Sequence, residues 1–215
     1  MPQIDTATLI IIVCNVLFSL KGFNDFSFFE KYKFNIAGIR RGEQIRMFTS
    51  GFLHVDFTHL LFNMLTLYFF APLVIGPLGV FKFVLIYVAG LVVGNLLSLY
   101  FHKDEYHYSA VGASGAVMAV LYAAIMFYPM EEFYLYFAIP IKAWILGVLY
   151  LLYSVWGMKK RIGNIGHDAH IGGAVAGYAL TIAFVPSLLQ TSLWIVGVLA
   201  APIILLFILH KLGKI

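Results

Sequence analysis

Long apolar runs, separated by short segments that carry charge, make up most of this chain. A helix that crosses the hydrocarbon core of a membrane needs about 20 mainly apolar residues. Charged residues bracket runs of roughly this length, the first being shorter than the rest, and each run predicts one membrane helix. In order, the predicted helices fall within residues 6–20, 57–81, 83–102, 106–130, 140–158, 169–185 and 188–209. Runs this long must form helices, because every backbone polar group in hydrocarbon must find a hydrogen-bond partner within the protein.

Proline and glycine residues divide or interrupt some of these runs. The stretch from Ala169 to His210 contains no Asp, Glu, Lys or Arg and is too long for one span, so Pro186 is taken to split it. The second run breaks at the Gly-Pro-Leu-Gly sequence of residues 76–79, and Pro202 interrupts the last run. The pattern predicts an all-α fold, a polytopic membrane helix bundle.

The segment between the first two helices, residues 21–56, has a different character. It is rich in Phe and mixes acidic with basic side chains. A disordered linker would not carry so many aromatic residues. We therefore expect a folded loop, partly in the membrane interface, that contains short amphipathic helices.

Composition supports this picture and excludes several classes of protein. The chain is 62% hydrophobic and 11% charged, whereas soluble domains have about 25% charged residues. This excludes both a soluble globular protein and a disordered one. The net charge of +4 comes from basic residues near the ends of the runs, which favours contact with lipid headgroups over binding of nucleic acid. Cys14 is the single cysteine, so no internal disulfide is possible.

Alternating spans bring four polar residues to one side of the membrane. The second, fourth and sixth helices run in the same direction. His59 and Asn63 lie near the start of the second, Ser114 at the start of the fourth and His170 at the start of the sixth. All four should therefore share one leaflet and a similar depth. Polar side chains at such positions are costly and call for an explanation.

Ser114 lies within the sequence Gly112-Ala113-Ser114-Gly115, where the fourth helix should begin. Glycine lets another backbone or a substrate approach closely. The N–H groups of the first turn have no helical partners and the helix dipole favours negative charge there, so an oxyanion beside Ser114 would meet donors. The alternative is a structural role, since Ser is a preferred N-cap residue.

His170 could take the proton of Ser114 and return it to a leaving amine, as a general base does. The alternatives are a structural hydrogen bond to a neighbouring helix and a metal site. His167 lies on the same helix face, and His54 and His59 could add ligands, although no His-Glu-x-x-His motif occurs. Asp168 is two residues from His170 and would point elsewhere on a helix, so a Ser–His dyad is favoured over a triad.

His59 and Asn63 are four residues apart, so their side chains point to one helix face. Both can donate hydrogen bonds to a developing oxyanion. The alternative is a polar clamp between helices. On the sixth helix Gly173 and Gly177 are also four apart, a spacing that lets helices pack backbone to backbone. This spacing predicts a close approach of the sixth helix to the fourth.

Taken together, these residues resemble the rhomboid intramembrane serine proteases. The matching motifs are Gly-x-Ser-Gly at Ser114, Ala-His-x-Gly-Gly at His170 and His-x-x-x-Asn from His59 to Asn63, in the family's order. The resemblance implies that Ser114 is the nucleophile, that His170 is the base, and that His59, Asn63 and the Ser114 N–H line the oxyanion hole. It also implies cleavage of single-pass transmembrane proteins in or near the membrane, without metal, ATP or another cofactor.

The resemblance also implies an organisation for the chain. We expect residues 1–215 to form a single membrane domain. Within it, residues 6–185 would form a rhomboid-like six-helix core with the interfacial loop 21–56, and residues 188–210 would form an additional membrane helix. Arg46 in this loop resembles part of the family's Trp-Arg pair, with Ile45 in place of Trp. Met118 stands where one bacterial branch has a Tyr that stacks on the catalytic His, so we expect His170 to be held more loosely.

Orientation and activity have competing readings. The positive-inside rule would put the Ser114 side in the cytoplasm, whereas the resemblance places it on the extracytoplasmic side of a bacterial inner membrane, which is the reading we adopt. The basic residues behind the first reading are Lys31, Lys33, Arg40, Arg41, Arg46, Lys159, Lys160 and Arg161. Two other functions stay open: a catalytically inactive relative that binds or delivers membrane clients, and a transporter or channel.

Overall fold

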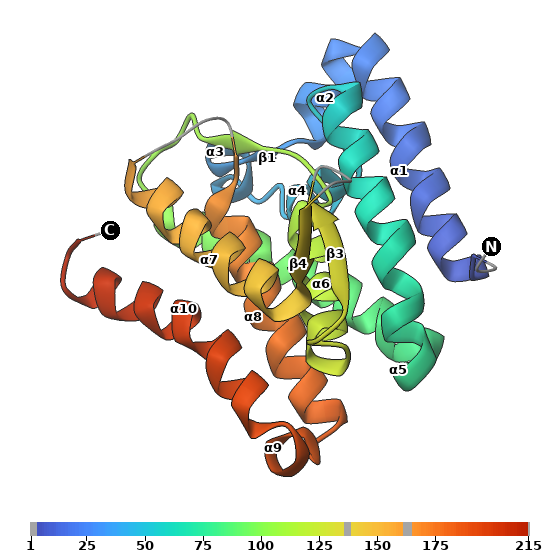
Figure 1. The fold of residues 1–215 in the computed structure, drawn as a ribbon. Coiled ribbons are helices and arrows are strands. Elements are labelled where there is room, and N and C mark those ends of the chain that lie inside the picture. Colours follow the sequence, from blue (N-terminus) through green and yellow to red (C-terminus); the bar gives the residue numbers. More distant parts are fainter. Residues whose placement is uncertain (1–3, 136–138, 161–164, 215) are drawn as a thin grey trace.

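The computed structural model describes residues 4–135, 139–160 and 165–214. Its helices and strands are arranged around a central helix (Figure 1). The first half of the chain contains α1 (Thr6–Asn24), α2 (Phe26–Tyr32), β1 (Phe34–Asn35), α3 (Ile36–Arg40), α4 (Arg46–Thr49), the short 3-10 helix η1 (Ser50–Phe52) and α5 (Phe57–Phe101). The second half contains β2 (Ser109–Ala110), α6 (Ser114–Phe127), β3 (Glu132–Leu135), β4 (Ile139–Lys142), α7 (Ala143–Lys160), α8 (His167–Phe184), α9 (Leu188–Thr191) and α10 (Leu193–Lys211).

The helix α5 contains both the second and the third predicted helices. The two parts meet at Gly79, whose backbone φ of 77° and ψ of 164° are not helical. Pro77 lies just before this point, and a proline removes a helical hydrogen bond. The predicted break at residues 76–79 is therefore confirmed. At the other predicted division, α8 ends at Phe184, directly before the Val185–Pro186 pair.

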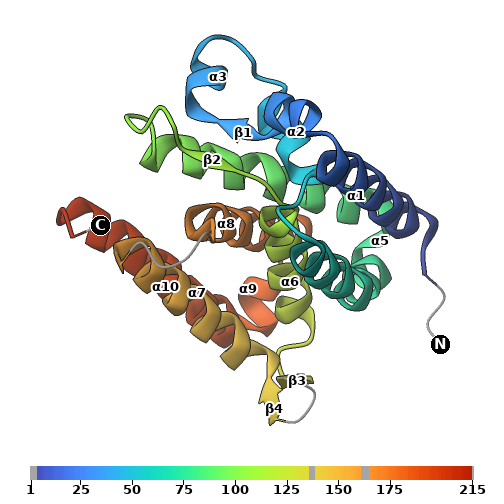
Figure 2. The same cartoon turned by 90° about the horizontal axis from the view of Figure 1, so that it is seen from above.

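The short helix α6 forms the centre of the bundle. Every residue from Gly115 to Met126 is buried. Seen from above, α5 and α1 lie on one side of α6, and α7 and α10 lie on the other (Figure 2). Both α5 and α8 pack closely along α6. A helix buried all round in this way needs an apolar sequence on every face, and α6 has one.

Glycines let α8 and α6 approach each other closely, as predicted. A Cβ added to Gly173 would lie 1.9 Å from the carbonyl oxygen of Gly115, and one added to Gly177 would lie 2.2 Å from that of Ala119. Distances this short leave no room for any side chain. The small-residue spacing of α8 therefore serves backbone-to-backbone packing of the kind found in membrane helix pairs.

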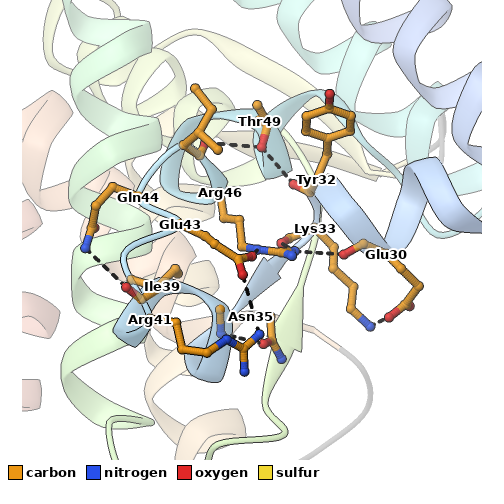
Figure 3. Close-up of polar contacts among 12 residues, drawn as sticks. Glu30, Tyr32, Lys33, Asn35, Ile39, Arg41, Glu43, Gln44, Arg46 and Thr49 are labelled. Atoms are coloured by element: carbon orange, nitrogen blue, oxygen red, sulfur yellow. Dashed lines mark hydrogen bonds and ion pairs between the residues drawn. The ribbon is translucent and has the colours of Figure 1, made fainter.

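The loop of residues 21–56 is folded and contains short helices, as expected from its aromatic residues. The side chain of Arg46, the first residue of α4, reaches residues of α2 and of the segments next to α2 and α3 (Figure 3). This guanidinium donates hydrogen bonds to the carbonyls of Glu30 (2.7 Å) and Lys33 (2.9 Å) and pairs with the carboxylate of Glu43. Strand β1 pairs with β2, so the loop is also tied to the segment that leads into α6.

Several boundaries differ from those predicted. The first helix continues to Asn24, because Asp25 ends it and caps α2 with a hydrogen bond to the N–H of Phe28. The fifth helix begins at Ala143 rather than 140, because residues 139–142 pair with β3 as a hairpin. The fourth helix begins at Ser114, as predicted, and follows β2.

Several helices are both long and apolar enough to cross a membrane. Within the described residues, α1, α5 and α10 are long and apolar enough to cross a membrane, and α6 is a shorter apolar helix. The outer helix α10 packs on α7. Near the end of α10, His210 forms a hydrogen bond with Tyr100 of α5 (3.0 Å). The predicted helical membrane bundle is confirmed.

Candidate active site

Ser114 is the first residue of α6 and is partly exposed. The N-cap position belongs to Ala113, and no side-chain capping bond is made there. The structural explanation of Ser114 as an N-cap is therefore wrong. Gly112 has a φ of 130°, a conformation that L side chains rarely adopt. This backbone turn places the serine at the opening of the helix.

The helices that carry Ser114 and His170 are in close contact near these two residues. Gly115 directly follows the serine, and a Cβ at this position would lie 3.2 Å from the carbonyl oxygen of Ala169. Gly173, one turn after His170, contacts the backbone of the same Gly115. The residues on both sides of His170 thus contact the residue next to Ser114. Among the hydrogen bonds of the described residues, none joins the two side chains directly.

The imidazole of His170 is buried and has a specific partner that the sequence argument missed. Its Nδ1 lies 2.8 Å from the phenolic oxygen of Tyr150, on α7, with the ring centroids 5.7 Å apart. The expectation that His170 is loosely held, drawn from Met118, is contradicted by this contact. Met118 is itself buried in the core. No signal in the sequence distinguishes Tyr150 from the other aromatic residues of an apolar helix.

His59 and Asn63 both lie near the start of α5, as expected. A Cβ at Gly112 would lie 2.9 Å from Nε2 of His59 and 3.7 Å from Oγ of Ser114, so both atoms border one small space. Nδ1 of His59 is buried and has no hydrogen-bond partner within the described part of the chain. The side-chain amide of Asn63 donates to the carbonyl of His59 (3.0 Å). The structure therefore brings His59 close to Ser114, while Asn63 bonds back to its own helix.

Asp168 points away from His170, as its position two residues earlier predicted. Its carboxylate lies 3.6 Å from Nε2 of His102, whose ring stacks on Tyr108 with the centroids 3.6 Å apart. Burial is the main cause that raises the pKa of Tyr108, and the nearby Asp168 raises it further. This cluster joins the loop after α5 to the start of α8 and contributes no third member to a catalytic group.

His54 connects the backbone before Ser114 to α1. It is fully buried, and its Nδ1 lies 2.8 Å from Oγ of Ser19. The N–H of Ala113, directly before Ser114, donates to Nε2 of His54 at 3.5 Å. Ser19 in turn donates to the carbonyl of Phe52 (3.0 Å). Burial, together with the neighbouring His59, lowers the pKa of His54 to about 3, so the ring is neutral and Nε2 is free to accept.

The metal alternative relied on four histidines. They lie in two pairs, His54 with His59 (ring centroids 4.9 Å apart) and His167 with His170 (6.4 Å). Within residues 4–135, 139–160 and 165–214, no group of three or more His, Cys, Asp or Glu side chains is placed to hold a metal ion.

Comparison with known proteins shows which family the chain belongs to. The model of the Rhomboid domain matches residues 41–187. The chain is 28% identical to RHOMBOID-like protein 12, mitochondrial, of Arabidopsis thaliana, over 77% of the chain and 54% of that protein. It is 30% identical to Rhomboid protein 1, mitochondrial, of Saccharomyces cerevisiae (62% of the chain, 40% of that protein) and 28% identical to Rhomboid protease GluP of Bacillus subtilis (65% and 26%). The chain thus spans about half or less of the length of these relatives.

Proposed function

The chain belongs to the rhomboid family, and from that premise we propose that it is an intramembrane serine endopeptidase with Ser114 as nucleophile and His170 as general base. It is an integral membrane protein. The observation that carries the proposal is the helix contact described above, in which Gly115 contacts the residues on both sides of His170. This contact packs the backbone beside Ser114 against the backbone on either side of His170, which supports a pairing of the hydroxyl with the imidazole.

The proposed reaction follows from these two groups. Oγ of Ser114 attacks the carbonyl carbon of a peptide bond while Nε2 of His170 takes its proton. The tetrahedral intermediate collapses, His170 gives the proton to the leaving amine, and an acyl-enzyme remains. Water, activated by the same imidazole, then releases the second product. Apo sites often show long or misaligned catalytic hydrogen bonds that tighten with substrate, so a missing Ser–His bond is compatible with this role.

The proposed oxyanion hole lies at the start of α6. The N–H of Ser114 is one of the first-turn donors that lack helical partners, and the positive end of the helix dipole lies there. The ring of His59 borders the same space as Oγ of Ser114. Asn63 would add its amide after giving up the hydrogen bond to the carbonyl of His59. Each such donor is worth roughly 10²–10³ in rate.

The substrate class is proposed from the depth of the serine. With 14 residues, α6 is about 21 Å long, shorter than the roughly 30 Å hydrocarbon core. We propose that α6 ends at the opposite membrane surface, where Glu131 and Glu132 follow it, so that its first residue, Ser114, lies below the near surface. We propose single-pass transmembrane proteins as substrates, whose helices unwind locally at the site. The relatives come from mitochondria and from bacteria; we propose a bacterial inner membrane, with the site opening to the extracytoplasmic side.

The test is cleavage of a reconstituted single-span substrate by the full chain in liposomes. Ser114→Ala should abolish cleavage and preserve the fold, since the Ser114 side chain makes no capping bond. The exposed Ser27 of α2 supplies a matched control, and Ser27→Ala should cleave at the wild-type rate. Wild-type cleavage by the Ser114→Ala variant would overturn the assignment.

A second candidate is the non-catalytic relative that binds membrane clients. It is favoured by one observation: among the hydrogen bonds of the described residues, none joins His170 to Ser114. A serine-reactive fluorophosphonate probe separates the two functions. Labelling that depends on both Ser114 and His170 supports the enzyme, whereas no labelling, together with retention of a transmembrane client, supports the binding protein.

A further inference from the structure

Building on the proposed protease function, we propose that Tyr150 is a positioning residue for His170. Its phenolic oxygen accepts a hydrogen bond from Nδ1–H of the imidazole. This contact selects the tautomer whose Nε2 is unprotonated and therefore free to take the proton of Ser114. It also gives the second N–H of the imidazolium a partner once the proton has been transferred.

The geometry supports a specific contact rather than general packing. The oxygen of Tyr150 lies 2.8 Å from Nδ1, and the two rings are tilted by 34°. His170 is only 6% exposed, so water cannot readily serve Nδ1 instead. The other ionisable groups that face the ring are His167 of α8, at a centroid distance of 6.4 Å, and His59 of α5. Among the described residues, Tyr150 is the hydrogen-bond partner of the His170 side chain.

The tautomer matters because a neutral imidazole carries a single N–H. If the proton is on Nε2, the ring cannot accept the proton of Ser114 at that atom. If the proton is on Nδ1, Nε2 has a free lone pair and the ring is a competent base. A phenol can donate as well as accept. The proposed role requires Tyr150 to accept, because only the Nδ1–H tautomer can take the proton of Ser114 and so form the imidazolium, which Tyr150 then also accepts from.

A tyrosine suits this position better than the carboxylate of a triad. A charged carboxylate within the membrane is expensive, and Asp168 is already directed to His102. A phenol has an ordinary pKa near 10 and is neutral at physiological pH. It therefore offers an acceptor for Nδ1–H without placing a buried charge beside the site.

Contacts on either side of Tyr150 fix its position. One turn earlier, the carbonyl of Gly147 accepts a hydrogen bond from the buried Tyr122 of α6 (2.8 Å). Two turns later, Gly157 packs against the ring of His167, where an added Cβ would lie 2.3 Å from Nε2. These contacts hold α7 against both α6 and α8. The phenol is thus supplied by a third helix that is tied to the helices of the two reacting groups.

The kinetic test compares Tyr150→Phe with Tyr153→Phe. Each variant removes one phenolic oxygen from α7 and keeps the ring, and the Tyr153 ring faces His167 instead of His170. Tyr150→Phe should lower kcat about 10- to 100-fold, as expected for losing a hydrogen bond to a charged group, with KM unchanged. Tyr153→Phe should stay within about twofold of wild type. An unchanged kcat in Tyr150→Phe, or an equal loss in both variants, would overturn the proposal.

A second measurement does not depend on proteolysis. Nitrogen-15 NMR of the histidine rings in the full-length Ser114→Ala protein reports which nitrogen carries the proton, with the His170 signals assigned by their absence from a His170→Gln variant. We expect Nδ1–H with Tyr150 present and a mixture of tautomers in Tyr150→Phe. A proton on Nε2 in the presence of Tyr150 would refute the positioning role. If the protein cleaves nothing and the tautomer is still as expected, the proposed function fails and the Tyr150 contact stands.

Discussion

The carbonyl oxygen of Ser50 accepts a hydrogen bond from the N–H of Gly112 at 3.0 Å. The end of the loop between α1 and α5 therefore holds the backbone two residues before Ser114. Asn95 of α5 fixes the loop in turn, because its amide donates to the carbonyl of Met47 (2.7 Å) and to Oγ of Ser50 (3.1 Å). The position of the proposed nucleophile thus depends on a loop that contributes none of the proposed catalytic groups.

Gly112 is the most constrained residue of this connection. Alanine would be strained at its φ of 130°, and its Cβ would meet the His59 ring at 2.7 Å. We expect Gly112→Ala to destabilise the protein by about 1–3 kcal/mol and to lower cleavage strongly by displacing Ser114 and His59. Thermal unfolding in detergent and substrate cleavage measure the two effects. The matched control is Gly76→Ala, where the added Cβ meets nothing within 4 Å; equal effects of both substitutions would contradict the argument.

Much of the fold could be predicted from the order of apolar runs and their breaks. The break before Gly79 follows from local backbone chemistry, and the division at Pro186 from the position of a proline, so the sequence alone indicates both. The close approach of α8 to α6 was likewise predicted from the spacing of Gly173 and Gly177. These features depend on residues that are near one another in the chain.

Contacts between distant residues were harder to predict. Tyr150 meets His170 only because α7 packs on α8, and nothing in its local sequence marks it. His54 was considered only as a metal ligand, whereas in the fold it pairs with Ser19, from another helix, and accepts from Ala113. The β3–β4 hairpin was missed because its residues continue the apolar pattern of the helix that follows.

The packing of α8 on α6 can be tested at Gly173. A methyl group there would overlap the carbonyl oxygen of Gly115 and force the two helices apart. Overpacking of this kind costs about 1–3 kcal/mol, and the displacement would also separate His170 from Ser114. Gly173→Ala should therefore lower both the unfolding temperature and the labelling of Ser114 by a fluorophosphonate. Gly197→Ala on α10, where the added Cβ meets nothing within 4 Å, should change neither; a Gly173→Ala variant with wild-type labelling would be inconsistent with this geometry.

The ion pair of Glu43 and Arg46 makes the loop sensitive to acid (Figure 3). The hydrogen bond from Arg46 is the main cause that lowers the pKa of Glu43 below its usual 4.5. Because the folded-state pKa is the lower one, the contribution is complete above pH 4.5 and is lost as pH falls through the folded value. Limited proteolysis of the loop between pH 7 and pH 3.5 should show wild type losing protection in acid. Glu43→Gln should be less protected already at pH 7, with a weaker dependence on pH.

The control for this experiment is Glu131→Gln, which removes an exposed carboxylate outside the loop. Its proteolysis should follow the wild-type pH dependence. If Glu43→Gln does so as well, the Arg46 pair contributes nothing to the acid sensitivity, and the loop is held by the bonds of Arg46 to the backbone carbonyls of Glu30 and Lys33 alone.

His54 links stability to pH in a higher range. Its pKa falls from the usual 6.5 to about 3 on folding, mainly through burial, while the nearby His59 lowers it further and Asp56 opposes the change. A neutral His54 is required because Nε2 accepts the N–H of Ala113. The unfolded chain binds this proton more readily, so the contribution is complete above pH 6.5 and declines as pH falls from there towards 3, by about 1.4 kcal/mol per pH unit.

The test measures the free energy of unfolding in detergent from pH 7.5 to pH 4.5. Its slope against pH should be less steep in His54→Gln than in wild type. His107→Gln, at an exposed histidine of the loop after α5, should keep the wild-type slope, and equal slopes in all three proteins would show that folding does not lower the pKa of His54.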